Sequence, residues 1–203
     1  MRRIIICLLV FTPCLLSAQF GVKAGLNFAN ITNANQINAS SHTGFNIGVF
    51  LDGSSKSILS SHSELLFSKQ GYDFATNTNT GTVNLNYLIL PQFLAINITK
   101  YVQIQAGAYL AYLLSASVDS TASTGNPSAD NLLKLYNRMD YGFAGGVEIH
   151  PIYSLIVGAR LNVSLGKLYK QPEEGQTYSF IPDFDAKNNV LQIYAGYKFG
   201  KEQ

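Results

Sequence analysis

Three histidines are the side chains of this sequence best suited to acid–base or metal chemistry: His42, His62 and His150. His42 lies in the segment Ser40-Ser41-His42-Thr43. A serine hydrolase or acyltransferase would need a serine, this histidine and an orienting carboxylate within hydrogen-bonding reach. The loop aspartates that could supply the carboxylate are Asp73, Asp119, Asp130 and Asp183. Because the sequence has no Gly-x-Ser-x-Gly nucleophile motif, we expect no catalytic residues and interpret His42 as a solvated loop histidine.

Metal and phosphate chemistry are not indicated either. The sequence contains neither His-x-x-x-His nor Cys-x-x-Cys, the spacings typical of metal ligands. The glycine-rich run Gly142-Phe143-Ala144-Gly145-Gly146 could cradle a phosphate at a helix N-terminus, but no helical pattern follows it. We expect His62 and His150 to occupy a turn or a rim. The sequence therefore predicts no metal, no cofactor and no enzymatic activity.

The composition excludes several classes of protein. The chain has 203 residues, with 14 Lys+Arg against 12 Asp+Glu, and its charged share of 13% is about half of the roughly 25% typical of soluble proteins. Aromatic residues make up 12%, which argues against disorder. Both cysteines lie within the first 14 residues, so a disulfide scaffold is excluded. No basic surplus points to nucleic acid as a partner.

The N-terminus has the layout of a cleavable signal peptide. Two arginines precede the apolar run Ile4 to Phe11, and Ser17-Ala18 supplies a small-residue cleavage site. The apolar run is shorter than the ~20 residues of a spanning helix. Residues 1–18 are therefore expected to be removed. The remaining residues, 19–203, are expected to form one domain without cysteine or net charge.

Hydrophobic alternation with a period of two recurs along the rest of the chain and predicts β-strands. The eight predicted strands are 20–28, 43–52, 57–70, 82–96, 102–115, 140–150, 154–166 and 188–199. In the first, Phe20, Val22 and Leu26 alternate with small or polar residues. In the fourth, the alternation predicts that Leu85, Tyr87, Ile89 and Phe93 lie on the apolar face. Asn84, Asn86 and Gln92 are predicted on the polar face.

The connections between the predicted strands alternate between short and long. Residues 53–56, 97–101 and 151–153 form short turns, whereas 29–42, 71–81, 116–139 and 167–187 form long polar loops. All long loops then lie at one end of an up-and-down meander. An even strand number with short turns at one end and long loops at the other is the pattern of outer-membrane β-barrels. The predicted fold is an all-β, eight-stranded antiparallel transmembrane barrel.

The polar face distinguishes this fold from a soluble lipocalin-like barrel, in which that face meets water. Water-exposed faces are rich in charged residues, but here glycine, asparagine, glutamine, serine and alanine predominate. We infer that this face lines the lumen and that the apolar face meets lipid. Aromatic residues support the choice because they fall near two rims. The lower rim has Phe20, Phe93, Tyr197 and Phe199, and the upper rim has Phe28, Phe45, Phe67, Tyr141 and Phe143.

Six short motifs carry a resemblance to a known family. They are Phe20-Gly21-Val22-Lys23-Ala24-Gly25-Leu26-Asn27, Glu64-Leu65-Leu66-Phe67-Ser68-Lys69-Gln70-Gly71, Asn86-Tyr87-Leu88-Ile89-Leu90-Pro91, Gln105-Ala106-Gly107-Ala108-Tyr109, Asp140-Tyr141-Gly142 and Gly196-Tyr197-Lys198-Phe199. In this order they resemble the PorT-like outer-membrane β-barrel family, relatives of the small OmpA/OmpX-type barrels. Two departures are an uncharged Ile89-Leu90 before Pro91, and four residues after Phe199. The resemblance implies the barrel fold, and the family includes a protein-secretion component.

An eight-stranded barrel has a lumen that side chains can fill. We expect Tyr109, Arg160, Gln103, Gln105 and Gln192 to fill it, which argues against a wide pore. Glu64 and Arg160 lie on opposite strands of the ring, and Lys23 and Glu148 share their inward phase. Because isolated buried charges are costly, these four residues are predicted to form a structural polar network, in which Glu64 accepts hydrogen bonds from Arg160 and from Lys23.

The sequence thus predicts a non-enzymatic protein of the bacterial outer membrane, either structural or binding through its long external loops. The first alternative is a component of a secretion or envelope-assembly machine, and a less favoured one is a lipid-modifying enzyme. The expected partners are the lipid bilayer and an unidentified extracellular or envelope protein, with no nucleic acid. We expect a monomer.

Overall fold

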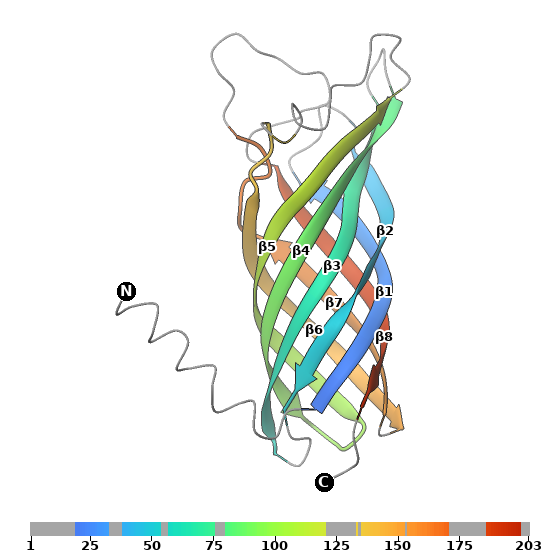
Figure 1. The fold of residues 1–203 in the computed structure, drawn as a ribbon, viewed down its shortest axis with the longest axis vertical. Helices are drawn as coiled ribbons and strands as arrows, with labels where there is room; N and C mark the ends of the chain where they lie inside the picture. The colour runs from blue at the N-terminus through green and yellow to red at the C-terminus, as the bar shows by residue number, and fades with distance from the viewer. Residues whose placement is uncertain are drawn as a thin grey trace, which may run out of the picture.

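The computed structural model describes residues 19–32, 38–53, 57–75, 80–120, 133, 135–152, 154–170 and 186–199. They form one closed barrel of antiparallel strands in sequence order (Figure 1). The strands are β1 (Gln19–Thr32), β2 (Ser40–Asp52), β3 (Leu59–Ala75), β4 (Thr80–Asn97), β5 (Val102–Ser120), β6 (Met139–Ile152), β7 (Leu155–Ser164) and β8 (Lys187–Lys198). Within the described ranges, no helix combines the length and the apolar character needed to cross a membrane.

The barrel closes by pairing its first and last strands. Ala24 of β1 is opposite Ala195 of β8 on one side and Ile47 of β2 on the other. Each hairpin follows the next along the chain, so the up-and-down meander and the number of strands are confirmed. The expected signal peptide at residues 1–18 lies outside the described residues.

Six of the eight strands are longer than the sequence predicted, whereas β8 keeps its predicted length and β7 is shorter. Most of the added residues lie at the end that carries the long loops, here called the long-loop end; the opposite end is the short-turn end. At the long-loop end, β3 and β5 each extend five residues beyond the predicted bounds, to Ala75 and Ser120. Figure 1 shows β3, β4 and β5 projecting above the other strands. The outward side chains on this projection are polar, among them Thr82, Asn84 and Asp119. The sequence predicted loops at these strand ends, because the many polar residues there are typical of loops.

The outward face of the barrel is apolar and aromatic at its edges. Near the short-turn end, the rings of Phe20 and Phe199 stack with centroids 5.8 Å apart. Towards the long-loop end, Tyr141 and Phe143 remain 53% and 63% exposed. Such large exposed apolar side chains are stable on a surface that lipid covers, and two aromatic girdles are typical of membrane barrels.

The predicted orientation of β4 is wrong. Leu85, Tyr87, Ile89 and Phe93 point inward and are at most 3% exposed, whereas Gln92 points outward. Leucines and an isoleucine occupy the alternate positions and supply the lipid face: Leu88, Leu90, Leu94 and Ile96. Because this segment is apolar on both faces, alternation cannot choose between them. The register with β3 decides, since the inward His62 pairs with Phe93.

The orientation of β4 can be tested with spin labels in bilayers. A label at Leu94→Cys is expected to be mobile and readily reached by lipid-dissolved oxygen, because Leu94 is 60% exposed on the outward face. A label at the adjacent Phe93→Cys is expected to be immobilised and shielded from oxygen, because Phe93 is buried in the lumen. Higher oxygen accessibility at position 93 than at position 94 would show that the register is inverted.

Candidate functional site

The carboxylate of Glu64 on β3 lies at the centre of a buried group of charges inside the barrel. Lys23 Nζ on β1 donates to Glu64 Oε1 at 2.7 Å. Arg160 Nη2 on β7 donates to both oxygens, at 3.1 and 3.0 Å. The ring nitrogen His62 Nε2 lies 2.7 Å from Oε1. One carboxylate therefore compensates groups from three strands, which is the condition under which buried charges are stable.

A chain of contacts leads from His62 to Glu148. His62 Nδ1 lies 3.4 Å from Asp52 Oδ1, and Asp52 Oδ2 accepts a hydrogen bond of 2.5 Å from Lys198 Nζ. Lys198 Nζ also lies 3.3 Å from His150 Nδ1, and His150 Nε2 lies 2.9 Å from Glu148 Oε1. Carboxylates only accept hydrogen bonds, so both nitrogens of His62 act as donors and its ring is cationic. His150 accepts at one nitrogen and donates at the other, as a neutral ring does.

Aromatic rings complete the surroundings of the two central cations. The Arg160 guanidinium carbon lies 4.6 Å from the centre of the Phe93 ring and 5.0 Å from that of Tyr194. Lys23 Nζ lies 3.4 Å above the Tyr194 ring. Arg160 Nε and Nη1 have no hydrogen-bond partner among the residues that the structure describes. Contacts with ring faces therefore supply part of the stabilisation that water would otherwise give this side chain.

Amide side chains fill the lumen next to the charged group. Asn27 Nδ2 donates to Ser68 Oγ at 2.9 Å, and Asn27 Oδ1 accepts from Asn46 at 2.7 Å and from Gln192 at 3.0 Å. On the other side, Gln105 Nε2 donates to Glu148 Oε2 at 3.2 Å. Hydrogen bonds therefore link the amides to one another, although Asn46 Oδ1 has no partner among the described residues.

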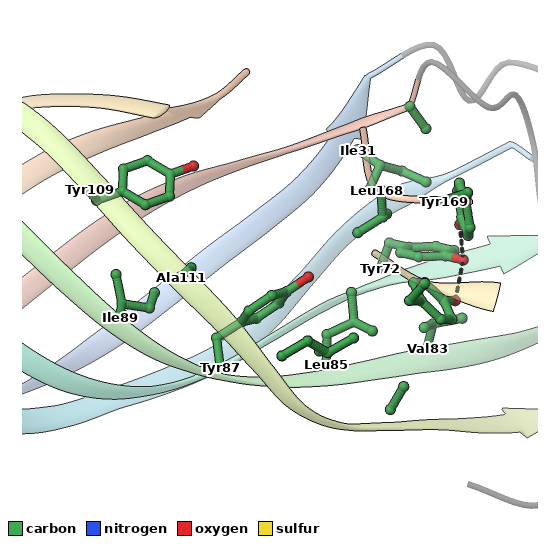
Figure 2. Close-up of a cluster of buried hydrophobic side chains, with 14 of the residues drawn as sticks. Ile31, Tyr72, Val83, Leu85, Tyr87, Ile89, Tyr109, Ala111, Leu168 and Tyr169 are labelled. Atoms are coloured by element: carbon green, nitrogen blue, oxygen red, sulfur yellow. Dashed lines mark hydrogen bonds between the residues drawn. The ribbon is translucent and has the colours of Figure 1, made fainter. Parts of the chain in front are cut away.

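The lumen towards the long-loop end is apolar. Figure 2 shows Val83, Leu85 and Tyr87 packed beside the inward ring of Tyr72. The Tyr72 hydroxyl is hydrogen-bonded to the hydroxyls of Tyr169 and Tyr136. Burial raises the pKa of the Tyr169 hydroxyl well above its usual value, so this group stays neutral. The buried side chains therefore continue from the charged group to the tyrosine trio.

Basic side chains gather where β6, β7 and β8 meet the long-loop end. Arg138, Lys167 and Lys170 are exposed, and Lys187 is partly exposed. Hydrogen bonds join their segments. Asn137 Nδ2 donates to the Lys167 carbonyl at 2.8 Å, Lys170 N donates to the Leu135 carbonyl at 2.9 Å, and Leu168 N donates to the Ala186 carbonyl at 2.9 Å. We call Arg138, Lys167, Lys170 and Lys187 the basic rim.

His42 lies in β2 rather than in a loop. Its Nδ1 is 3.2 Å from Asp73 Oδ1, which also accepts a hydrogen bond of 2.6 Å from Thr82 Oγ1. Of the aspartates considered as its partner, Asp130 and Asp183 lie outside the described residues, and Asp119 contacts Asn84 instead. In the described part of the chain, no serine oxygen is hydrogen-bonded to His42.

Comparison with known proteins identifies the family. The family model described as the outer membrane protein beta-barrel domain matches residues 12–170. The chain belongs to this family. The barrel therefore lies in the bacterial outer membrane. This match identifies the broad family and does not distinguish the PorT-like proteins within it.

Solved structures agree with the fold. The attachment invasion locus protein Ail of Yersinia pestis is 14% identical, with a TM-score of 0.51 over 91% of this chain and 100% of that chain. Neisserial surface protein A is 16% identical, with a TM-score of 0.52 over 89% of this chain and 97% of that chain. At this identity the likeness is one of fold. A comparison with curated proteins gave no match.

The structure places all four predicted network residues of this outer-membrane barrel in the lumen. Lys23 and Arg160 both contact Glu64, whereas Glu148 joins them through His150 and Tyr194. The expected lumen-filling residues, Gln103, Gln105, Tyr109, Arg160 and Gln192, are all at most 6% exposed. Sequence reasoning put His62 and His150 at a turn or rim, which is wrong because both are buried in the network. Strand alternation could have predicted their burial, because each lies two residues from an inward-facing glutamate, His62 from Glu64 and His150 from Glu148.

Removal of Glu64 tests whether the network stabilises the barrel. We expect Glu64→Gln to cost about 3–5 kcal/mol of unfolding free energy, because Lys23 and Arg160 would stay buried without their shared carboxylate. The double change Glu64→Gln with Arg160→Met is expected to cost less than the sum of the two single changes. The measurement is a urea titration in which gel mobility separates folded from unfolded barrel.

A matched control for this titration is Glu148→Gln. The hydrogen-bond donors to Glu148 are His150, Gln105 and Tyr194, which are neutral, so a smaller loss is expected than for Glu64→Gln. Additive effects of Glu64→Gln and Arg160→Met, or equal losses for the two glutamates, would contradict a stabilising ion pair.

Proposed function

We propose that this protein is a non-enzymatic surface protein, a closed outer-membrane barrel that binds an anionic ligand at its long-loop end. The observation that carries the proposal is the filled lumen. Arg160, Tyr72, Tyr87, Phe93 and Leu113 are all at most 1% exposed although they point into the barrel. A lumen packed in this way leaves no path for a solute, so the function is assigned to the surface.

The basic rim is the part of this surface that suits a ligand of defined chemistry. It presents three exposed cations and a fourth that is partly exposed, on segments fixed by hydrogen bonds to one another. Clustered Lys and Arg side chains attract phosphate or sulfate groups. Ail, a protein of the same fold, has been crystallised in complex with the heparin analogue sucrose octasulfate, at a TM-score of 0.50 and 14% identity. A sulfated glycan is therefore the ligand class that we propose.

Absence of catalysis is part of the proposal and is supported by the surroundings of His42. Its ring contacts Asp73, and the hydroxyl beside that carboxylate belongs to Thr82, which donates its proton to Asp73. A nucleophilic hydroxyl must instead donate to the histidine. A lipid-modifying enzyme would need a different arrangement at this end of the barrel.

A component of a secretion or envelope-assembly machine is the alternative that the PorT-like resemblance suggests. Such a component acts by contact with other envelope proteins. The two functions differ in what deletion changes: the set of secreted proteins for a secretion component, and glycan binding at the cell surface for the function proposed here.

Reconstitution into a planar bilayer tests the closed lumen. The folded full chain is expected to give no steady ion conductance, because packed side chains replace water along the barrel. Gel mobility shows that the inserted protein is folded, and a protein-free bilayer is the control. A stable, reproducible conducting state would contradict the closed lumen and favour a channel function.

Titration with sucrose octasulfate tests the basic rim. The full chain in detergent is expected to bind this probe at low salt and to lose affinity as salt rises. The double change Lys167→Gln with Lys170→Gln should weaken binding about tenfold, since each exposed cation contributes up to about 1 kcal/mol. Lys100→Gln, at a short turn, is the matched control and should bind like the unchanged chain. Undetectable binding at low salt, or equal weakening by both changes, would overturn the proposed ligand site.

A further inference from the structure

Gln92 is a polar side chain in the middle of the lipid-facing surface. It points outward from β4, and its neighbours on the same face of that strand are Leu88 and Leu90 on one side and Leu94 and Ile96 on the other. Those four side chains are 37–60% exposed, as expected of residues that contact lipid. An uncharged amide placed between two pairs of aliphatic side chains lies at the depth of the hydrocarbon, where polar groups are rare and costly.

The amide of Gln92 is only half satisfied within the chain. Ser63 Oγ on β3 donates a hydrogen bond of 2.5 Å to Gln92 Oε1. No acceptor for the amide N–H groups is found in the described ranges of the chain. Lipid tails offer no acceptor either, so an unpaired N–H at this depth carries the full cost of lost hydration.

The surface beside Gln92 carries small, uncharged side chains on β5, and the exposed ring of Phe143 on β6 borders it opposite Ala108. Ala108 pairs with Gln92 across the β4–β5 ladder, and Ala106 occupies the next outward position of β5. On β6, Gly145 pairs with Ala106, and a Cβ added there would meet only the Gln105 carbonyl, at 3.5 Å. Small residues allow two membrane surfaces to approach closely, and polar side chains then join them by hydrogen bonds.

We propose that a second copy of this chain covers this surface and that the two Gln92 amides hydrogen-bond to each other across a two-fold axis normal to the membrane. An amide is self-complementary, because it carries both a donor and an acceptor. A second copy places its own Gln92 at the same depth, which a lipid headgroup cannot do. An isologous dimer of this kind closes on itself. The proposal replaces the monomer expected from the sequence and does not depend on the ligand of the basic rim.

Sedimentation equilibrium of the full chain in density-matched detergent measures the association. We expect a reversible dimer. Its dissociation constant should rise about tenfold in Gln92→Leu, because two hydrogen bonds between polar side chains within a membrane stabilise an association by about that factor. Gln92→Leu should fold normally, since leucine is the residue found at neighbouring lipid-facing positions. Leu191→Ala, on the opposite strand β8, is the matched control and should dimerise like the unchanged chain.

Cross-linking in native outer membranes gives an independent test that keeps Gln92 in place. A flexible bis-maleimide should link Leu90→Cys to a second copy and should leave Leu191→Cys monomeric. The unchanged chain reports any contribution of Cys7 and Cys14. Adding Gln92→Leu to Leu90→Cys should reduce the linked dimer several-fold. A monomeric unchanged chain, equal linking at positions 90 and 191, an unaffected Gln92→Leu variant, or linkage of position 90 to a different protein would each overturn the proposal.

Discussion

The buried carboxylate of Glu64 is the group on which the interior of this barrel depends. Two obligate cations, Lys23 and Arg160, reach it from β1 and β7, and the cationic ring of His62 reaches it from β3. All of these side chains are buried, so each is tolerated only while the others are present. The contacts also tie together strands that are not neighbours in the sheet. Backbone pairing joins each strand to the next, whereas Glu64 and Arg160 connect opposite walls of the ring.

The chemical character of the lumen changes along its axis. The charged group and its aromatic rings are followed by hydrogen-bonded amides, and towards the long-loop end Leu85, Tyr87 and Tyr72 form an apolar cluster. The charged and amide levels are linked by hydrogen bonds between side chains, and the apolar level has few polar atoms. A lumen built in this way behaves as the core of a protein rather than as a passage. It leaves the outer surface as the place where an outer-membrane barrel of this family can meet a ligand or a partner.

That outer surface is divided by the membrane. Between the aromatic girdles it is mostly apolar, and its polar side chains on β3 and β4 include Ser61, Ser63 and Gln92. Above them, the basic rim and the projecting ends of β3 to β5 meet water. Polar groups at these two depths differ in what can hydrogen-bond to them. A lysine at the rim is exposed to solvent, whereas the amide at position 92 can be satisfied only by another protein at the same depth.

The sequence by itself determined the eight strands, their order and the inward position of Lys23, Glu64, Glu148 and Arg160. Strand alternation has a period of two, so one charged residue on an otherwise apolar strand fixes which face points inward. The sequence could not determine the orientation of β4, where both faces are apolar, and it therefore assigned Phe93 to the lipid and Gln92 to the lumen. It also missed Asp52, His62 and Lys198 as partners, because Lys198 on β8 reaches the paired Asp52 and His62 of β2 and β3 from the other end of the chain. Only the closed register of the barrel brings them together, since a side chain's level in the lumen depends on the stagger of all eight strands.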